Sequence, residues 1–108
     1  MSNQSLRILV VDDEPDIRHL VSEILEDEGY QVSMAENASV AKMLKVSLNP
    51  DLILLDIWMP DTDGITLLKE WLAEDKPLCP VIMMSGHGSV EAAVEATRLG
   101  AFDFLEKP

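Results

Sequence analysis

The stretch Leu52-Ile-Leu-Leu-Asp56 decides the fold, because four consecutive apolar residues end in a carboxylate. A continuous apolar run of this length is typical of a strand that helices cover on both faces, and such strands belong to parallel sheets. The runs Ile8 to Val11 and Val81 to Met84 have the same character. The sequence therefore predicts a parallel sheet whose central strands are buried.

Further strands and helices alternate along the chain around this stretch. The expected strands are Leu6 to Val11, Tyr30 to Ala35, Leu52 to Ile57, Val81 to Met84 and Phe102 to Leu105. The second of them alternates between apolar and polar residues, which favours an edge position. Four helices are expected between the strands: from Pro15 to just before Gly29, from after Asn37 to before Pro50, from about Gly64 to before Pro77, and from near Ser89 to Gly100. Their apolar residues recur at helical spacing, and the whole pattern is typical of an α/β fold.

Length, charge and cysteine content exclude several classes of function. The chain has 108 residues, 8 Lys plus Arg, 20 Asp plus Glu and a formal net charge of −12. That length fits one domain, and its acidity disfavours binding to nucleic acid or to anionic lipid. The segment Met1 to Ser5 is polar and no apolar stretch is long enough to cross a membrane, so we expect a cytoplasmic protein. A lone Cys79 among apolar neighbours predicts a buried, inert thiol in a reducing compartment.

Polar residues stand at the carboxyl ends of four expected strands. They are Asp12, Asp13 and Glu14 after the first strand, Asp56 after the third, Ser85 after the fourth and Lys107 at the end of the fifth. Open α/β sheets bind ligands at this edge, where the strand order reverses. We therefore expect these side chains to form one site.

The carboxylates of this site indicate a divalent metal. Asp12 or Asp13, Asp56 and a backbone carbonyl just beyond Asp56 would provide the oxygen ligands that Mg²⁺ prefers. A zinc site built from His19 and His87 is disfavoured, because the two residues lie far apart and in different sequence contexts.

With a metal in place, Asp56 could act as a nucleophile towards a phosphoryl group and form an acyl phosphate. Lys107 and Ser85 would then contact phosphoryl oxygens. The simpler interpretation of Asp12, Asp13 and Asn37 is that they cap helices, but capping does not explain Asp56, which no helix start follows directly.

Four pieces of the chain together resemble the receiver domain of two-component response regulators. They are Leu9-Val-Val-Asp-Asp-Glu14, Leu54-Leu-Asp-Ile-Trp-Met-Pro60 with Asp63-Gly64, Met84-Ser-Gly-His-Gly88, and Gly100-Ala-Phe-Asp-Phe-Leu-Glu-Lys-Pro108. The last two pieces are most similar to the nitrogen-regulation group. Receivers of that group precede two further domains. One is an ATPase that activates the alternative sigma factor, and the other is a DNA-binding domain.

The resemblance implies a role for each matching residue. Asp56 would be the phosphoacceptor, and the metal ligands would be Asp12, Asp13, Asp56 and the Trp58 backbone carbonyl. Ser85 would be the switch hydroxyl, Lys107 the invariant lysine and Phe104 the switch aromatic. Trp58 and His87 would tune dephosphorylation. The resemblance also implies a cis Lys107-Pro108 peptide bond, which would aim the lysine into the site.

The implied function is a phosphorylation-activated signalling domain. Its partner would be a sensor histidine kinase, its metal Mg²⁺, and its output dimerisation and transcription regulation through domains outside this chain. Such a domain is not an enzyme acting on other molecules, since it promotes only its own phosphotransfer and dephosphorylation. The alternative is a receiver-like interaction domain that signals without phosphorylation.

Three other interpretations fit the residues less well. A haloacid dehalogenase-like phosphatase needs a second Asp at the position of Trp58, and a flavin site would need a phosphate-binding loop where Asp12-Asp-Glu-Pro-Asp16 stands. A calcium loop over Asp61 to Glu70 would have Met59 at its first position, so Asp61 to Gly64 is more simply a turn.

The resemblance predicts a flavodoxin-like, doubly wound, five-stranded parallel sheet with strand order 2-1-3-4-5. Right-handed crossovers then place the first helix on one face and the other three on the opposite face. One helix cannot cover a five-stranded face, so we expect a receiver domain over residues 6–108 that lacks its fifth helix, preceded by a polar tail at 1–5. The apolar patch left by the missing helix would favour self-association.

Overall fold

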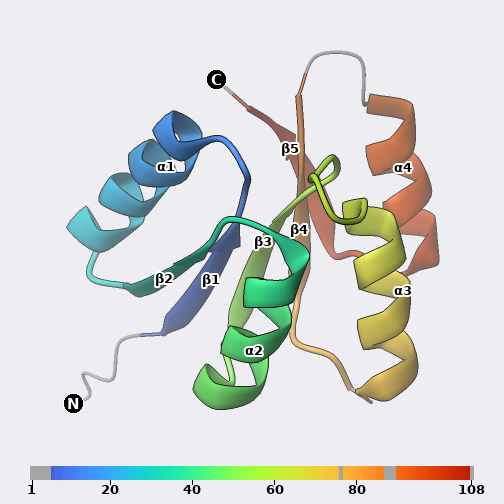
Figure 1. Ribbon diagram of the computed structural model, residues 1–108, viewed down its shortest axis with the longest axis horizontal. Coiled ribbons are helices and arrows are strands. Elements are labelled where there is room, and N and C mark those ends of the chain that lie inside the picture. The colour runs from blue at the N-terminus through green and yellow to red at the C-terminus, as the bar shows by residue number, and fades with distance from the viewer. Residues whose placement is uncertain (1–5, 76, 87–89, 108) are drawn as a thin grey trace.

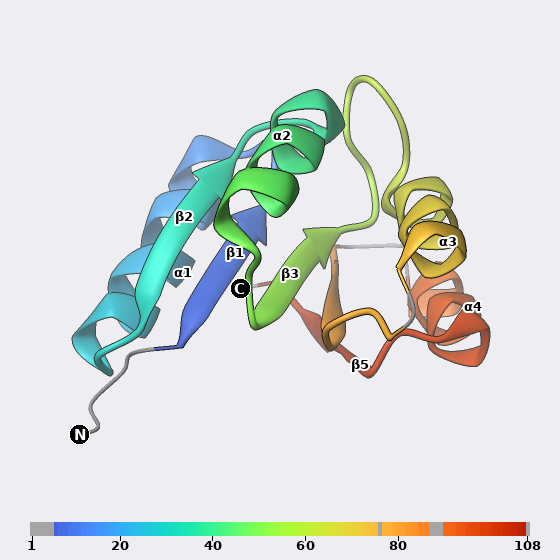
Figure 2. The same ribbon diagram turned by 90° about the horizontal axis from the view of Figure 1, so that it is seen from below.

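The computed structural model describes residues 6–75, 77–86 and 90–107, which form one sheet between two layers of helices (Figures 1 and 2). In chain order the elements are β1 (Arg7–Val11), α1 (Pro15–Asp27), β2 (Gln31–Ala35), α2 (Ala38–Leu48), β3 (Leu52–Asp56), α3 (Gly64–Glu74), β4 (Val81–Ser85), α4 (Val90–Leu99) and β5 (Asp103–Glu106). The alternation of strands and helices confirms the predicted α/β class.

The sheet has the order β2-β1-β3-β4-β5, and every neighbouring pair is parallel. This confirms the predicted order and the edge position of β2. The register aligns Val10 with Leu54, Leu54 with Ile82, and Met84 with Leu105. The carboxyl ends of β1, β3, β4 and β5 therefore meet at one edge of the sheet.

Two strand boundaries differ from the sequence prediction in a way that concerns the site. Asp56 and Ser85 are the last residues of β3 and β4, whereas the sequence placed Ser85 after its strand and extended the third strand to Ile57. The reason is that backbone pairing continues to these residues, since Asp56 pairs with Met84 and Ser85 with Glu106. Both side chains are thereby held by the rigid sheet.

The helices divide between the two faces as predicted. Helix α1 packs Val21 and Leu25 on a cluster that contains Val10 and Met84, and α2, α3 and α4 cover the larger core on the opposite face (Figure 2). Leu105 lies in register with Met84 on the α1 side and is 41% exposed. The fifth helix expected after residue 108 stays a prediction.

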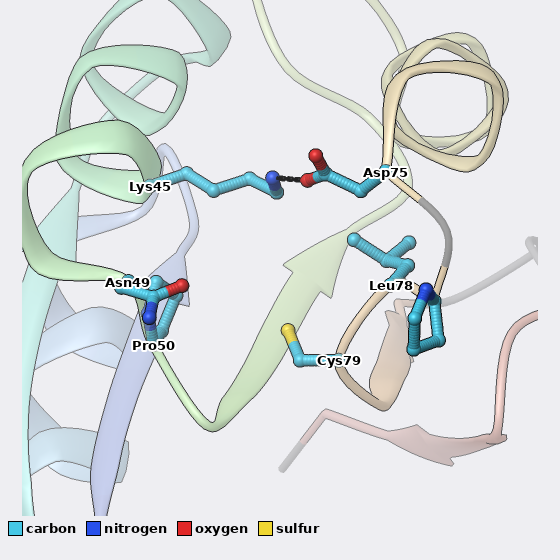
Figure 3. Close-up of a pocket in the computed structure, with 7 residues that line it drawn as sticks. Lys45, Asn49, Pro50, Asp75, Leu78 and Cys79 are labelled. Atoms are coloured by element: carbon cyan, nitrogen blue, oxygen red, sulfur yellow. Dashed lines mark hydrogen bonds and ion pairs between the residues drawn. The ribbon is translucent and has the colours of Figure 1, made fainter.

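Cys79 is only partly buried, whereas the sequence predicted a buried thiol. The residue precedes β4 and lines a cavity of about 260 Å³ at the sheet edge opposite the carboxyl ends of the strands (Figure 3). Its partial burial raises the pKa of the thiol, which agrees with the predicted low reactivity. Across the same cavity Lys45 forms an ion pair with Asp75 and lies 5.6 Å from the centre of the Trp71 ring.

In the part of the chain that the structure describes, no helix has the length and apolar character needed to cross a membrane.

Candidate functional site

The structure brings the predicted acidic residues together at the carboxyl edge of the sheet. Asp12 follows β1 directly and Asp56 ends the neighbouring strand β3. One oxygen from each of Asp12, Asp13 and Asp56 lies within 4.8 Å of the others. A cavity of about 290 Å³ opens here and is lined by Asp13, Glu14, Asp56, Trp58, Gly86 and Lys107.

Two of the three carboxylates are buried. Asp12 is 0% exposed and Asp56 is 2% exposed, whereas Asp13 faces solvent. Asp12 Oδ1 accepts hydrogen bonds from the Glu14 backbone N–H at 2.9 Å and from Lys107 Nζ at 3.2 Å. The buried Asp12 Oδ2 has an ion-pair contact with Lys107 Nζ at 3.1 Å but accepts no hydrogen bond among the described residues. Beyond that one ion-pair contact, the buried oxygen has acceptor capacity that a hard cation would use.

Lys107 is the cation of the cluster. Its Nζ lies 3.1 Å from Asp56 Oδ2, 3.1 Å from Asp12 Oδ2 and 2.7 Å from Glu14 Oε1. The backbone N–H of Lys107 donates to the Ser85 carbonyl at 2.9 Å, which continues the pairing of β5 with β4 and aims the side chain into the site. Burial opposes its charge, but the hydrogen bonds to Glu14, Asp12 and Asp56 outweigh this effect and raise the pKa of Lys107, so it stays protonated.

One ammonium group does not balance the surrounding carboxylates. Burial and the nearby charge of Asp12 raise the pKa of Asp56 from 3.8 to about 7, although Lys107 acts in the opposite direction. Near neutral pH, Asp56 without a metal is therefore partly protonated. A divalent cation among these oxygens would favour the carboxylate form, so the donor set fits Mg²⁺.

The remaining predicted residues surround this centre. Ser85 is buried, and its hydroxyl donates to the Leu105 carbonyl at 3.4 Å. Phe104 is partly buried and packs against the core on the side of α3 and α4. The Trp58 side chain is 62% exposed at the rim of the cavity. His87 and the Lys107-Pro108 bond lie outside the described residues.

Three contacts at or near the site were not predicted from the sequence, although Glu14 itself was expected there. Glu14, at the N-cap position of α1, makes no side-chain capping bond there and pairs with Lys107 instead. Asp61 is more than a turn residue, because its carboxylate accepts hydrogen bonds from the start of α2. A Cβ on Gly64 would lie 2.1 Å from the Asp56 carbonyl oxygen, so only glycine permits this close approach. These contacts join segments that are remote in sequence and have no local signal.

A doubly wound sheet of this order, with an acidic cluster and a lysine at its carboxyl edge, defines the receiver class of signalling domain. The chain belongs to the response regulator receiver domain family, which matches residues 8–108. This family assignment agrees with the resemblance seen in the sequence motifs.

The chain is also similar to individual regulatory proteins and to solved structures. The chain is 50% identical over 103 residues to the nitrogen assimilation regulatory protein NtrX of Azorhizobium caulinodans, covering 94% of this chain and 22% of that protein. It is 43% identical to the regulatory protein AtoC of Escherichia coli, with 94% and 22% covered. The receiver domain of NtrX from Brucella abortus superposes with a TM-score of 0.87 at 50% identity, covering 94% of this chain and 85% of that domain. The chain thus spans about a fifth of the length of these two curated relatives.

Proposed function

We propose that Asp56 accepts a phosphoryl group from a phosphohistidine of a sensor histidine kinase. The observation that carries this proposal is the cluster itself, in which the buried Asp56 carboxylate lies beside Asp12 and Asp13 with Lys107 Nζ at 3.1 Å. In the transfer, an Asp56 oxygen attacks phosphorus, the phosphorus–nitrogen bond breaks, and its electron pair returns to the imidazole. With the other ring nitrogen of the phosphohistidine protonated, the products are an acyl phosphate and a neutral histidine on the kinase.

The residues around Asp56 have separate tasks in this step. Asp12, Asp13, Asp56 and the Trp58 carbonyl would hold Mg²⁺, which offsets negative charge on the phosphoryl oxygens when bound. Lys107 is already within hydrogen-bonding distance of Asp56 and would move its contact to a phosphoryl oxygen. The exposed Trp58 ring at the rim, together with His87, would govern the access of water and hence the lifetime of the acyl phosphate.

Phosphorylation would act as a switch through β4 and β5. The new charge and acceptor oxygens at Asp56 favour a state in which Ser85 leaves the Leu105 carbonyl and donates to the phosphoryl group. Phe104 on β5 would then turn inward, which alters the surface of α4 and β5 and promotes dimerisation. In the full-length protein this change would control transcription, as the names of the regulatory relatives suggest. DNA contacts would belong to other domains, because this chain carries a net charge of −12.

The proposal is tested by intact mass spectrometry after incubation with acetyl phosphate and Mg²⁺. We expect one added phosphoryl group in the wild-type chain and none in Asp56→Asn, whereas the matched control Asp27→Asn at the end of α1 keeps the adduct. An unmodified wild-type chain, or an adduct that survives Asp56→Asn, would favour the interaction domain that works without phosphorylation. If Phe104→Ala left phosphorylation-dependent association unchanged, the route through β5 would be wrong.

A further inference from the structure

The connection between β3 and α3, residues 57–63, is tied to the neighbouring helix α2 through Asp61. Asp61 Oδ1 accepts a hydrogen bond from the Ala38 backbone N–H at 3.0 Å. Asp61 Oδ2 accepts bonds from the Ser39 backbone N–H at 3.1 Å and from the Ser39 hydroxyl at 3.3 Å. The connection and the first turn of α2 lie side by side in both views (Figures 1 and 2).

Helix α2 already has a cap from its own sequence. The side chain of Asn37 accepts a hydrogen bond from the Val40 backbone N–H at 2.9 Å, which is the usual N-cap contact. Asp61 adds to this cap from outside the helix, and its charge is favoured at a helix N-terminus. The hydrogen bond from Ala38 outweighs the opposing effect of burial and lowers the pKa of Asp61. The tie is therefore charge-assisted.

The two ends of the connection are held independently of Asp61. The Ile57 backbone N–H donates to the Met84 carbonyl at 3.3 Å, and the Gly64 N–H donates to the Ile57 carbonyl at 2.6 Å. Asp63 caps α3 by accepting from the Thr66 N–H at 2.7 Å. Between these two ends lie residues 58–62, and within this stretch the side chain of Asp61 hydrogen-bonds to another element, helix α2. Among the residues that the structure describes, only Asp61 anchors the middle of the connection by a side-chain hydrogen bond.

We propose that Asp61 is a positioning residue for the metal and phosphoryl site, acting by fixing the segment that carries Trp58 against α2. This inference rests on the proposed function, in which the Trp58 carbonyl is a metal ligand. Trp58 lines the cavity beside Asp56 and stands three residues before Asp61. A ligand on an anchored segment is already ordered before the metal binds, so binding loses less conformational entropy. Loss of supporting contacts around a metal site typically weakens metal affinity by about tenfold or more.

The test is calorimetric titration of Mg²⁺ into the wild-type chain and into Asp61→Ala, with the stability of each measured by urea unfolding. We expect Asp61→Ala to bind Mg²⁺ about tenfold more weakly. Asp61→Asn keeps one acceptor oxygen and should fall between the two, and it also serves if Asp61→Ala does not fold. Backbone hydrogen exchange over residues 57–63 in the absence of metal should be faster in Asp61→Ala.

Two control variants separate positioning from other causes. Asn37→Ala weakens the same helix end without touching the connection, so it should lose stability and keep its Mg²⁺ affinity. Asp63→Asn removes one negative charge from the same connection while keeping a capping oxygen, so its Mg²⁺ affinity should stay near that of the wild type. Wild-type affinity in Asp61→Ala, or equal weakening in either control, would overturn the inference. If the wild type binds no Mg²⁺, or Asp56→Asn binds it equally well, the proposed metal site fails, and hydrogen exchange still reports whether Asp61 anchors the segment.

Discussion

Replacing the carboxylate of Asp56 with an amide should make the chain more stable at high pH relative to the wild type. In the folded protein, burial and the charge of Asp12 raise the pKa of Asp56 from 3.8 to about 7. The folded state therefore binds a proton more tightly than the unfolded state does. The contribution of Asp56 to the stability of the wild type is greatest at low pH, where both states hold that proton. It is lost as the pH rises from about 4 through 7.

The size of the effect follows from the pKa difference. A shift of about three units corresponds to about 4 kcal/mol once Asp56 is fully ionised in both states, since one unit is about 1.4 kcal/mol. Asp56 is 2% exposed, so solvent screening reduces this figure little. Between pH 5 and pH 8, the stability advantage of Asp56→Asn over the wild type should grow by about 2–3 kcal/mol.

The assay is urea unfolding of both proteins at several pH values in the presence of EDTA, followed by circular dichroism. A matched series with Mg²⁺ in place of EDTA should restore the stability of the wild type at pH 8 and leave Asp56→Asn unchanged. Two parallel pH curves in EDTA would refute the reasoning, because they would mean that the Asp56 carboxylate is not destabilised by its surroundings.

Three further substitutions test the packing and charges of the fold. Lys107→Met leaves the buried carboxylates of Asp12 and Asp56 without their cation, so the free energy of unfolding should fall by about 3 kcal/mol. The pKa of Asp56 should rise further, which carbon-13 NMR of its carboxyl group would show, and an unchanged titration would contradict the ion pair. Gly64→Ala places a Cβ 2.1 Å from the Asp56 carbonyl oxygen, so it should lower the melting temperature more than the control Gly29→Ala does. At Gly29 no atom lies within 4 Å of the added Cβ, and only the positive φ is strained. Equal losses of melting temperature would show that the backbone between β3 and α3 shifts to make room for the Cβ. Leu67→Ala removes a side chain that is 0% exposed and should cost about 2–5 kcal/mol in urea unfolding, against about 0.5 kcal/mol or less for Val46→Ala at 84% exposure.

The elements of the fold could be predicted because their signals are local. The apolar run from Leu52 to Leu55 indicates a strand covered on both faces, and β3 is that strand, with three of these four residues buried. The spacing from Ile17 to Leu25 predicts a helix, and α1 spans it. The alternation in the second strand indicates an edge, and β2 is at the edge of the sheet. Periodicity carries this information because each period matches the geometry of one backbone conformation.

The predicted gathering of carboxylates also follows from topology. Once strands are parallel, their carboxyl ends share an edge, so residues after β1 and at the end of β3 must meet. The strand ends at Asp56 and Ser85 were harder to place, because pairing of the backbone in space, and not hydropathy, decides where a strand stops. Cys79 has apolar neighbours in sequence, yet the cavity beside Lys45 leaves it partly exposed.

The sequence by itself determined the α/β class, the strand order through its family motifs, and the set of acids, hydroxyl and lysine at one edge of the sheet. Only the tertiary structure decided that Glu14 pairs with Lys107 across 93 residues, that Asp61 ties its segment to α2, and that Gly64 touches the Asp56 backbone. The physical reason is that hydropathy patterns describe how a segment lies relative to a core, whereas ion pairs and steric contacts depend on distances between segments. Those distances exist only after the sheet and helices have packed.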